Sequence, residues 1–187
     1  SVAGPLSAMV AAHAAMVAVM TMTPLQLEHA GHGLTELGWV LGAHMVGMFA
    51  LAPLSGRLAD RFGATVAIYA GIGTLWLSVL TVVMAPTSHD AGLPLGLFLL
   101  GYGWNLVFVG GSKSMTAVLA AGERARVQGA VDACVWSAAA VASVAAGPLY
   151  QLGGLVLVAV VAGVLTVVPL VLVARGRAVP TTERAAA

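Results

Sequence analysis

Charged residues are scarce in this sequence. Only 8% of the 187 residues are Asp, Glu, Lys or Arg, whereas 60% are hydrophobic. A soluble domain carries charge on about a quarter of its residues, because its surface must face water. The shortage of charge therefore excludes an ordinary soluble domain and favours a protein that lies in a membrane.

Cysteine is nearly absent as well. Cys134 is the single cysteine, which excludes a disulfide framework within the chain and a multi-cysteine metal site. The histidines show no metal-ligand spacing. The sequence GGSK at residues 110–113 lacks the spacing of a phosphate-binding loop. No pattern is typical of nucleophilic catalysis. We therefore expect no enzyme activity, no cofactor, no bound metal and no nucleic-acid partner.

Long apolar runs are what the sequence has instead. Each approaches the roughly 20 residues that a helix needs to cross a bilayer, and lipid forces such a segment to be helical. Six runs are expected to span the membrane, at residues 5–23, 36–55, 64–84, 93–109, 126–146 and 152–173. Pro24 is expected to end the first helix, and Gly147 with Pro148 the fifth. The predicted fold is an all-α membrane domain over residues 1–174, followed by a disordered cytoplasmic tail over 175–187.

The positive charges orient these helices. Six crossings put three connections on each side, and every Lys and Arg falls on one side, at Arg57, Arg61, Lys113, Arg124, Arg126, Arg175, Arg177 and Arg184. The opposite loops carry Glu28, Glu36 and Asp90 without any Lys or Arg. The positive-inside rule then places the basic loops and both termini in the cytoplasm. The preference for arginine over lysine is typical of a GC-rich bacterial gene, so we expect the bacterial inner membrane.

The densest charge lies between the second and third expected helices, in the sequence GRLADRFG at residues 56–63. Gly56 and Gly63 predict a tight turn of a polar hairpin near the membrane surface. Asp60 is expected to accept hydrogen bonds from the start of a neighbouring helix or to pair with a nearby arginine. Arg61 is expected to contact lipid phosphates or a helix C-terminus. The plainer alternative is a turn whose arginines only fix the topology.

This stretch resembles the loop motif of the major facilitator superfamily: a glycine, three residues, an aspartate, a basic residue, one residue and a glycine. The family motif continues with two basic residues, whereas Ala64 and Thr65 follow here, which resembles the weaker copy in the second half of the family. The sequences LGYGWN at 100–105 and ERARVQG at 123–129 also resemble C-terminal halves of bacterial members. The resemblance implies half of a twelve-helix bundle, built as a 3+3 inverted repeat. Its missing partner is the N-terminal six-helix half.

The resemblance further implies secondary active transport of a small molecule by alternating access. Efflux, as by an antiporter, is the direction typical of such bacterial members. Gly56, Asp60, Arg61 and Gly63 would brace one conformational state against the other half. Expected partners are the lipid bilayer, a small-molecule substrate and protons. Two alternatives stay open: a standalone six-helix membrane interaction protein and a non-transporting fragment.

Polar side chains within the apolar runs are candidate sites, because they are costly in lipid. One face of the first helix carries Met9, His13, Met16 and Met20. This face is either a core stripe or the adaptable wall of a substrate cavity. His44, with Met48 one turn later, is a candidate for substrate contact and for carrying a proton, or it makes a structural hydrogen bond. Asn105 either orients a ligand or bonds to another helix.

Asp132 is the one acid well inside an apolar run. Gln128, Asp132 and Trp136 share a face of the fifth expected helix. One hypothesis makes Asp132 a second proton-coupling residue. The other makes Gln128 and Asp132 a gate latch, in which Asp132 pairs with Arg124 or with an arginine of the missing half.

Overall fold

The structure, a computed structural model, describes residues 2–85, 91–120 and 122–177, the last three by their backbone alone. All the secondary structure that it describes is helical. The elements are α1 (Ala3–His29), α2 (Leu34–Met45), the π-helix η1 (Val46–Ala50), α3 (Ala52–Phe62), α4 (Ala64–Met84), α5 (Gly92–Thr116), α6 (Arg124–Leu165) and α7 (Val167–Arg177). Helix α7 therefore includes the first three residues of the expected tail, and the remainder of the tail lies outside the described residues.

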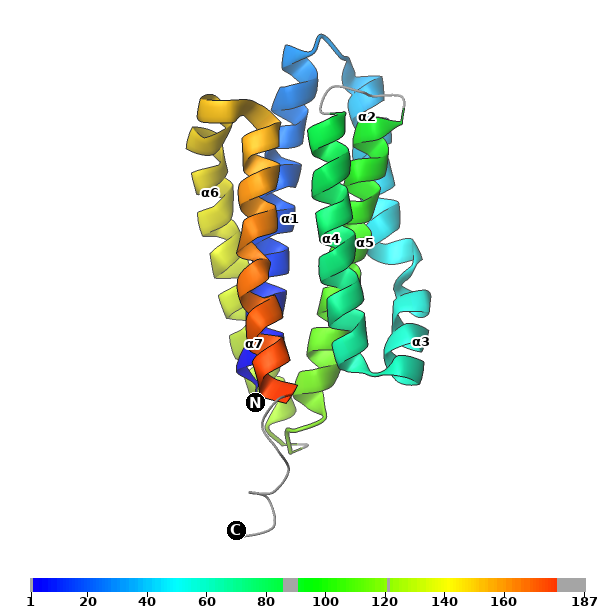
Figure 1. Ribbon diagram of the computed structural model, residues 1–187, viewed down its shortest axis with the longest axis vertical. Coiled ribbons are helices and arrows are strands. Elements are labelled where there is room, and N and C mark those ends of the chain that lie inside the picture. Colours follow the sequence, from blue (N-terminus) through cyan, green and yellow to red (C-terminus); the bar gives the residue numbers. More distant parts are fainter. Residues whose placement is uncertain (1, 86–90, 121, 178–187) are drawn as a thin grey trace.

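The described helices cross the bundle six times, and successive passes run in opposite directions (Figure 1). The second pass consists of α2, η1 and α3 in succession. Residues 124–174 form one apolar segment of 51 residues, which at about 1.5 Å per residue is far longer than the roughly 30 Å hydrocarbon core of a bilayer. This segment doubles back at Gly153 and Gly154, where Gly154 has φ +62°, a conformation that needs glycine. Five apolar helical segments thus make six passes, which confirms the all-α membrane fold.

Two predicted helix ends are wrong, and both involve proline. Helix α1 continues through Pro24, and α6 continues through Pro148. Proline removes only one backbone hydrogen bond, and its fixed φ is helical, so a long apolar helix can absorb it. The first helix ends instead at His29, and the chain turns at Gly31, whose φ is +81°. There the N–H of His32 donates to the carbonyl of Leu27 at 3.0 Å, which caps the helix end.

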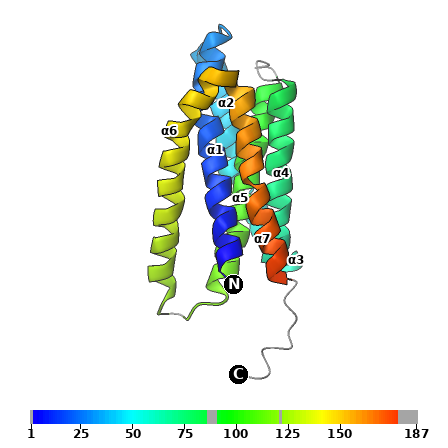
Figure 2. The same cartoon turned by 60° about the vertical axis from the view of Figure 1, so that its left-hand side comes forward.

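The passes pack around α5 and α1. Helix α4 packs along one side of α5, the second pass along another, and α1 lies between α5 and the first limb of α6 (Figure 2). Glycines allow some backbones to touch, as small residues do between helices in lipid. A Cβ atom added at Gly47 would lie 2.2 Å from the carbonyl oxygen of Phe98. One added at Gly101 would lie 2.5 Å from the carbonyl oxygen of His44, so η1 and α5 are in direct backbone contact.

The described part of the chain begins and ends at one end of the bundle (Figure 1), and the basic residues gather at this end. This end holds the end of α3, the end of α5, the start of α6 and the end of α7, which carry Arg57, Arg61, Lys113, Arg124, Arg126, Arg175 and Arg177. Glu28 and Glu36 lie at the opposite end. Asp90 and Arg184 are outside the described residues. The one-sided arrangement that the helix count predicts is therefore present among the residues that the structure describes.

Candidate functional site

The charged motif is mostly helical, so the predicted polar hairpin is wrong. Helix α3 includes Gly56 and extends to Phe62. Only Gly63, with φ +94°, turns the chain into α4. Gly56 lies inside the helix and makes no turn, and a Cβ atom there would meet nothing within 4 Å among the described residues. Proline in the first turn of α3 favours the helix, because its missing N–H would be unpaired there in any case.

Lys113 joins this motif to α5. Its Nζ lies 2.5 Å from Oδ1 of Asp60 and donates to the carbonyl oxygen of Ala59 at 2.9 Å. Asp60 thus pairs with a lysine across the helix interface, rather than with the neighbouring arginines that the sequence suggested. The sequence analysis gave Lys113 no partner. The one available signal was that the single lysine of the chain stands at the end of an apolar helix.

His44 is fully buried between the second pass and α5. Its Nδ1 lies 2.9 Å from the carbonyl oxygen of Leu97. A carbonyl only accepts, so Nδ1 carries the ring proton and Nε2 holds a lone pair. Nε2 is buried and has no hydrogen-bond partner among the described residues. His44 can therefore accept a second proton at Nε2 and keep its bond to α5.

Asn105 fastens the irregular part of the second pass. Its Nδ2 donates to the carbonyl oxygen of Met48 at 2.8 Å. Met48 lies in the π-helix η1, about one turn before Pro53. Proline has no N–H, so a carbonyl oxygen in the turn before it lacks its usual hydrogen-bond donor. Asn105 supplies a donor in this region, so an interhelical bond is what the structure contains. Its Oδ1 is buried and unpaired among the described residues, and its role toward a ligand stays open.

His13 lies within a cluster of aromatic rings. The Nε1 N–H of Trp104 in α5 donates to Nδ1 of His13 at 2.8 Å. Trp136 of α6 meets the imidazole edge-on, with ring centroids 4.7 Å apart. Phe108 lies next to Trp104, with centroids 5.0 Å apart. The sequence analysis found His13 but missed both tryptophans as its partners, because they come from other helices.

The methionines that share a helix face with His13 pack inside the bundle. Met9 is buried beside Met115, Val131 and Val135. Met16 belongs to the main hydrophobic core, and Met20 is partly buried. The structure thus gives these residues a packing role within the six passes.

Asp132 bonds within its own helix and not to Arg124, the first of its two predicted partners; the pairing with an arginine of the other half stays a prediction. Nε2 of Gln128 donates to Oδ1 of Asp132 at 3.0 Å, one turn apart on α6. Arg124 is instead bonded through Nε to the carbonyl oxygen of Leu119 at 3.3 Å. The predicted contact between Arg124 and Asp132 is therefore not the one that the structure forms.

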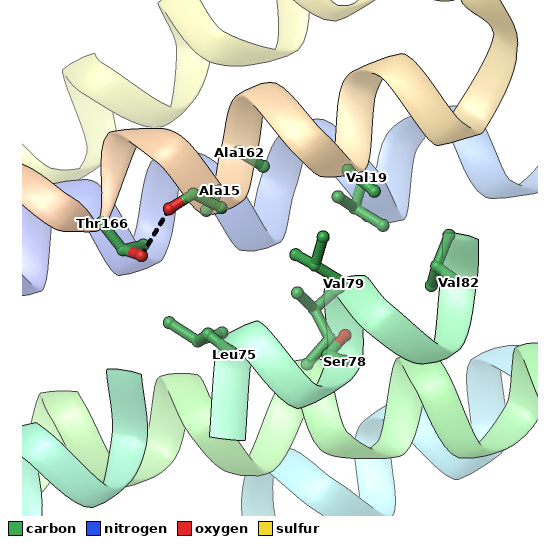
Figure 3. Close-up of a pocket in the computed structure, with 11 residues that line it drawn as sticks. Ala15, Val19, Leu75, Ser78, Val79, Val82, Ala162 and Thr166 are labelled. Atoms are coloured by element: carbon green, nitrogen blue, oxygen red, sulfur yellow. Dashed lines mark hydrogen bonds between the residues drawn. The ribbon is translucent and has the colours of Figure 1, made fainter. Parts of the chain in front are cut away.

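A cavity between α1, α4, α5 and the second limb of α6 is too small for a substrate (Figure 3). Its volume is about 10 Å³, close to the roughly 10–15 Å³ that a single water requires. Ser78 and Thr166 line it, and their hydroxyls donate to backbone carbonyl oxygens at 2.7 Å. A larger open groove of about 860 Å³ runs between α2 and α5, beside Trp39 and Phe98. Neither the small cavity nor the open groove is a closed, substrate-sized chamber.

Comparison with known proteins decides the family. The model of the Major Facilitator Superfamily matches residues 6–187. The chain belongs to the Major Facilitator Superfamily. This confirms the family that the motif at 56–63 indicated, and it makes the chain a member of a transporter family.

Three relatives show how much of a transporter the chain covers. An uncharacterized MFS-type transporter, YddS of Bacillus subtilis (strain 168), is 40% identical over 124 residues, which are 66% of this chain and 28% of that protein. A second one, YdeG of the same strain, is 32% identical over 171 residues, 90% of this chain and 40% of that protein. The riboflavin transporter RfnT of Brucella anthropi is 32% identical over 150 residues, 80% and 37% respectively. The matched part of the chain thus spans well under half of each relative.

Proposed function

We propose that this chain is the C-terminal six-helix half of a secondary transporter. The protein would move a small organic molecule across the bacterial cytoplasmic membrane by alternating access, as an efflux antiporter driven by protons. One observation carries the proposal: a superfamily member folds as six passes and matches at most 40% of the length of these relatives. The degenerate motif at residues 56–63 favours the second half.

The uncovered faces of the bundle support a partner half. In the most apolar 18-residue stretch of the second pass, only 22% of the residues are buried. Trp39, Phe49 and Leu54 on this pass are exposed. The N-terminal half would cover part of this face and lipid the remainder. The basic end of the bundle, with both termini, would then face the cytoplasm.

His44 is our first candidate for proton coupling, because its free Nε2 is buried and its Nδ1 is already fixed to α5. Asp132 is the second. Gly56, Asp60, Arg61 and Gly63 would brace the cytoplasmic end, and Lys113 would hold Asp60 in place for that contact. Gln128, Asp132 and Arg124 would form a gate with the other half. In this arrangement a proton on His44 would alter the packing of the second pass against α5.

Transport by the intact protein in proteoliposomes tests this function. We would begin the compound panel with riboflavin, because one relative is named a riboflavin transporter. We expect saturable uptake that a pH gradient accelerates and a proton ionophore abolishes, and we expect Asp132→Asn to reduce it. Absence of protein-dependent uptake for the whole panel, with helical protein verified by circular dichroism, would contradict the proposal.

A further inference from the structure

The imidazole of His13 carries a buried hydrogen-bond donor that no described residue accepts. The indole N–H of Trp104 can only donate, so Nδ1 of His13 is an acceptor, and the proton of the neutral ring lies on Nε2. His13 is only 2% exposed, and Nε2 has no partner among the described residues. Native proteins rarely leave a buried donor unpaired. This donor therefore needs an acceptor from outside the described residues.

Aromatic rings lie against the imidazole that carries this donor. The imidazole of α1 lies between Trp104 of α5, at 5.8 Å between centroids, and Trp136 of α6, at 4.7 Å. Phe108 extends the ring cluster along α5. Trp136 is 65% exposed, so its indole presents free ring surface beside a buried polar atom. Such a surface suits a flat ring, which gains from stacked or edge-to-face contact.

We propose that His13, Trp104, Phe108 and Trp136 bind a planar aromatic substrate that carries a carbonyl or a ring nitrogen as hydrogen-bond acceptor. The acceptor receives a hydrogen bond from the Nε2 N–H of His13, and the ring of the substrate stacks on Trp136. Asp132 lies one turn before Trp136 on α6, so a neutral or cationic ring fits better than an anionic one. This inference names the substrate class of the transporter and rests on the proposed function.

A matched pair of ligands isolates the hydrogen bond. The probes are 9-fluorenone and fluorene, which share one flat tricyclic frame, although only fluorenone has a carbonyl. Equilibrium binding would be measured with the intact protein in lipid nanodiscs, and partition into empty nanodiscs would be subtracted. We expect fluorenone to bind roughly five- to tenfold more tightly than fluorene, as one net hydrogen bond allows.

Matched variants then locate the site. His13→Phe keeps a ring but removes the donor, so the affinity for fluorenone should fall to that for fluorene, and fluorene should be unaffected. Trp136→Leu should weaken the binding of both compounds. Trp39→Leu is the control, because this exposed indole lines the separate groove between α2 and α5, and it should change neither affinity. Circular dichroism verifies that each variant is folded.

Two outcomes would overturn the site: equal affinity of the native protein for the two probes, or fluorenone binding that His13→Phe leaves unchanged. Equal affinity is expected if a side chain from another part of the protein already accepts the hydrogen bond from Nε2 of His13. Binding is measured without transport, so the two proposals fail separately. Selective fluorenone binding without uptake of any compound rejects the proposed function and leaves the site. Uptake of other compounds without fluorenone binding rejects the site alone.

Discussion

His44 and His13 face α5 from two sides and use their ring nitrogens in opposite ways. His44 donates from Nδ1 to a backbone carbonyl of α5, so its free nitrogen is a lone pair. His13 accepts at Nδ1 from an indole of α5, so its free nitrogen is an N–H. Protonation of His44 preserves its bond, whereas protonation of His13 at Nδ1 would break the bond to Trp104. The partner group across the interface, a backbone carbonyl for His44 and an indole N–H for His13, thus decides which histidine suits proton transfer and which suits a ligand.

The interfaces around the two histidines differ in the same way. On the His44 side, glycines bring backbones into contact, and the polar atoms bond to carbonyl oxygens. On the His13 side, large rings separate the backbones. The first interface should therefore tolerate added volume least, and the second should depend on ring shape and on a single polar atom.

The largest effect is expected for Gly47→Ala. The new Cβ would lie 2.2 Å from a backbone oxygen of α5, which cannot move without shifting the helix. We expect the free energy of unfolding to fall by about 3 kcal/mol, as in severe overpacking. Denaturant titration in mixed micelles, followed by circular dichroism, measures the change. Gly42→Ala is the control in the same pass, since its Cβ would meet nothing within 4 Å; equal losses for the two variants would refute the direct backbone contact.

Asn105→Leu should have the next largest effect. It removes the donor to the carbonyl oxygen of Met48 in a buried interface. An unpaired buried carbonyl costs about 2 kcal/mol, and the same titration would show this loss. Thr74→Val removes a hydroxyl that bonds only within α4, and it should change stability by less than about 0.5 kcal/mol. A stable Asn105→Leu variant would mean that η1 does not need this bond.

Lys113→Met should have a smaller effect. The pair of Lys113 and Asp60 is 41% and 77% exposed, so its loss, with that of the bond to Ala59, should cost about 1 kcal/mol. A double-mutant cycle with Asp60→Asn should give a coupling energy of about 0.5 kcal/mol that salt weakens. Arg57→Met, which removes a charge from the same helix as Asp60, is the control. Zero coupling would remove Lys113 from the proposed brace.

The smallest change in stability is expected for His44→Asn, which has the largest functional consequence. The amide N–H of Asn can replace the Nδ1 donor to Leu97, whereas the titratable Nε2 is lost. We expect stability within about 0.5 kcal/mol of the native protein and uptake that no longer responds to a pH gradient. His13→Phe, assayed on a compound that it still transports, should retain that response. Intact coupling in His44→Asn would exclude His44 as the proton carrier.

The sequence predicted much of the fold but little of the detail at the site. The apolar runs indicated all six passes, since the thickness of the bilayer sets their length. The helix ends predicted at Pro24 and Pro148 are wrong. A helix in lipid tolerates the loss of one backbone hydrogen bond, because ending the helix would expose several unpaired backbone groups. The turn predicted at Gly56 is also wrong, because the neighbouring residues favour a helix and glycine permits a turn without requiring one.

The membrane fold, the gathering of basic residues at one end and the family could all be predicted from the sequence alone. Each follows from composition and from a motif that is contiguous in the chain. The tertiary structure was needed to show that Lys113 holds Asp60 and that His13 and His44 carry their protons on opposite nitrogens. Those contacts depend on the rotation of each helix about its axis. The apolar runs leave that rotation open, because lipid-facing and protein-facing sides are both apolar.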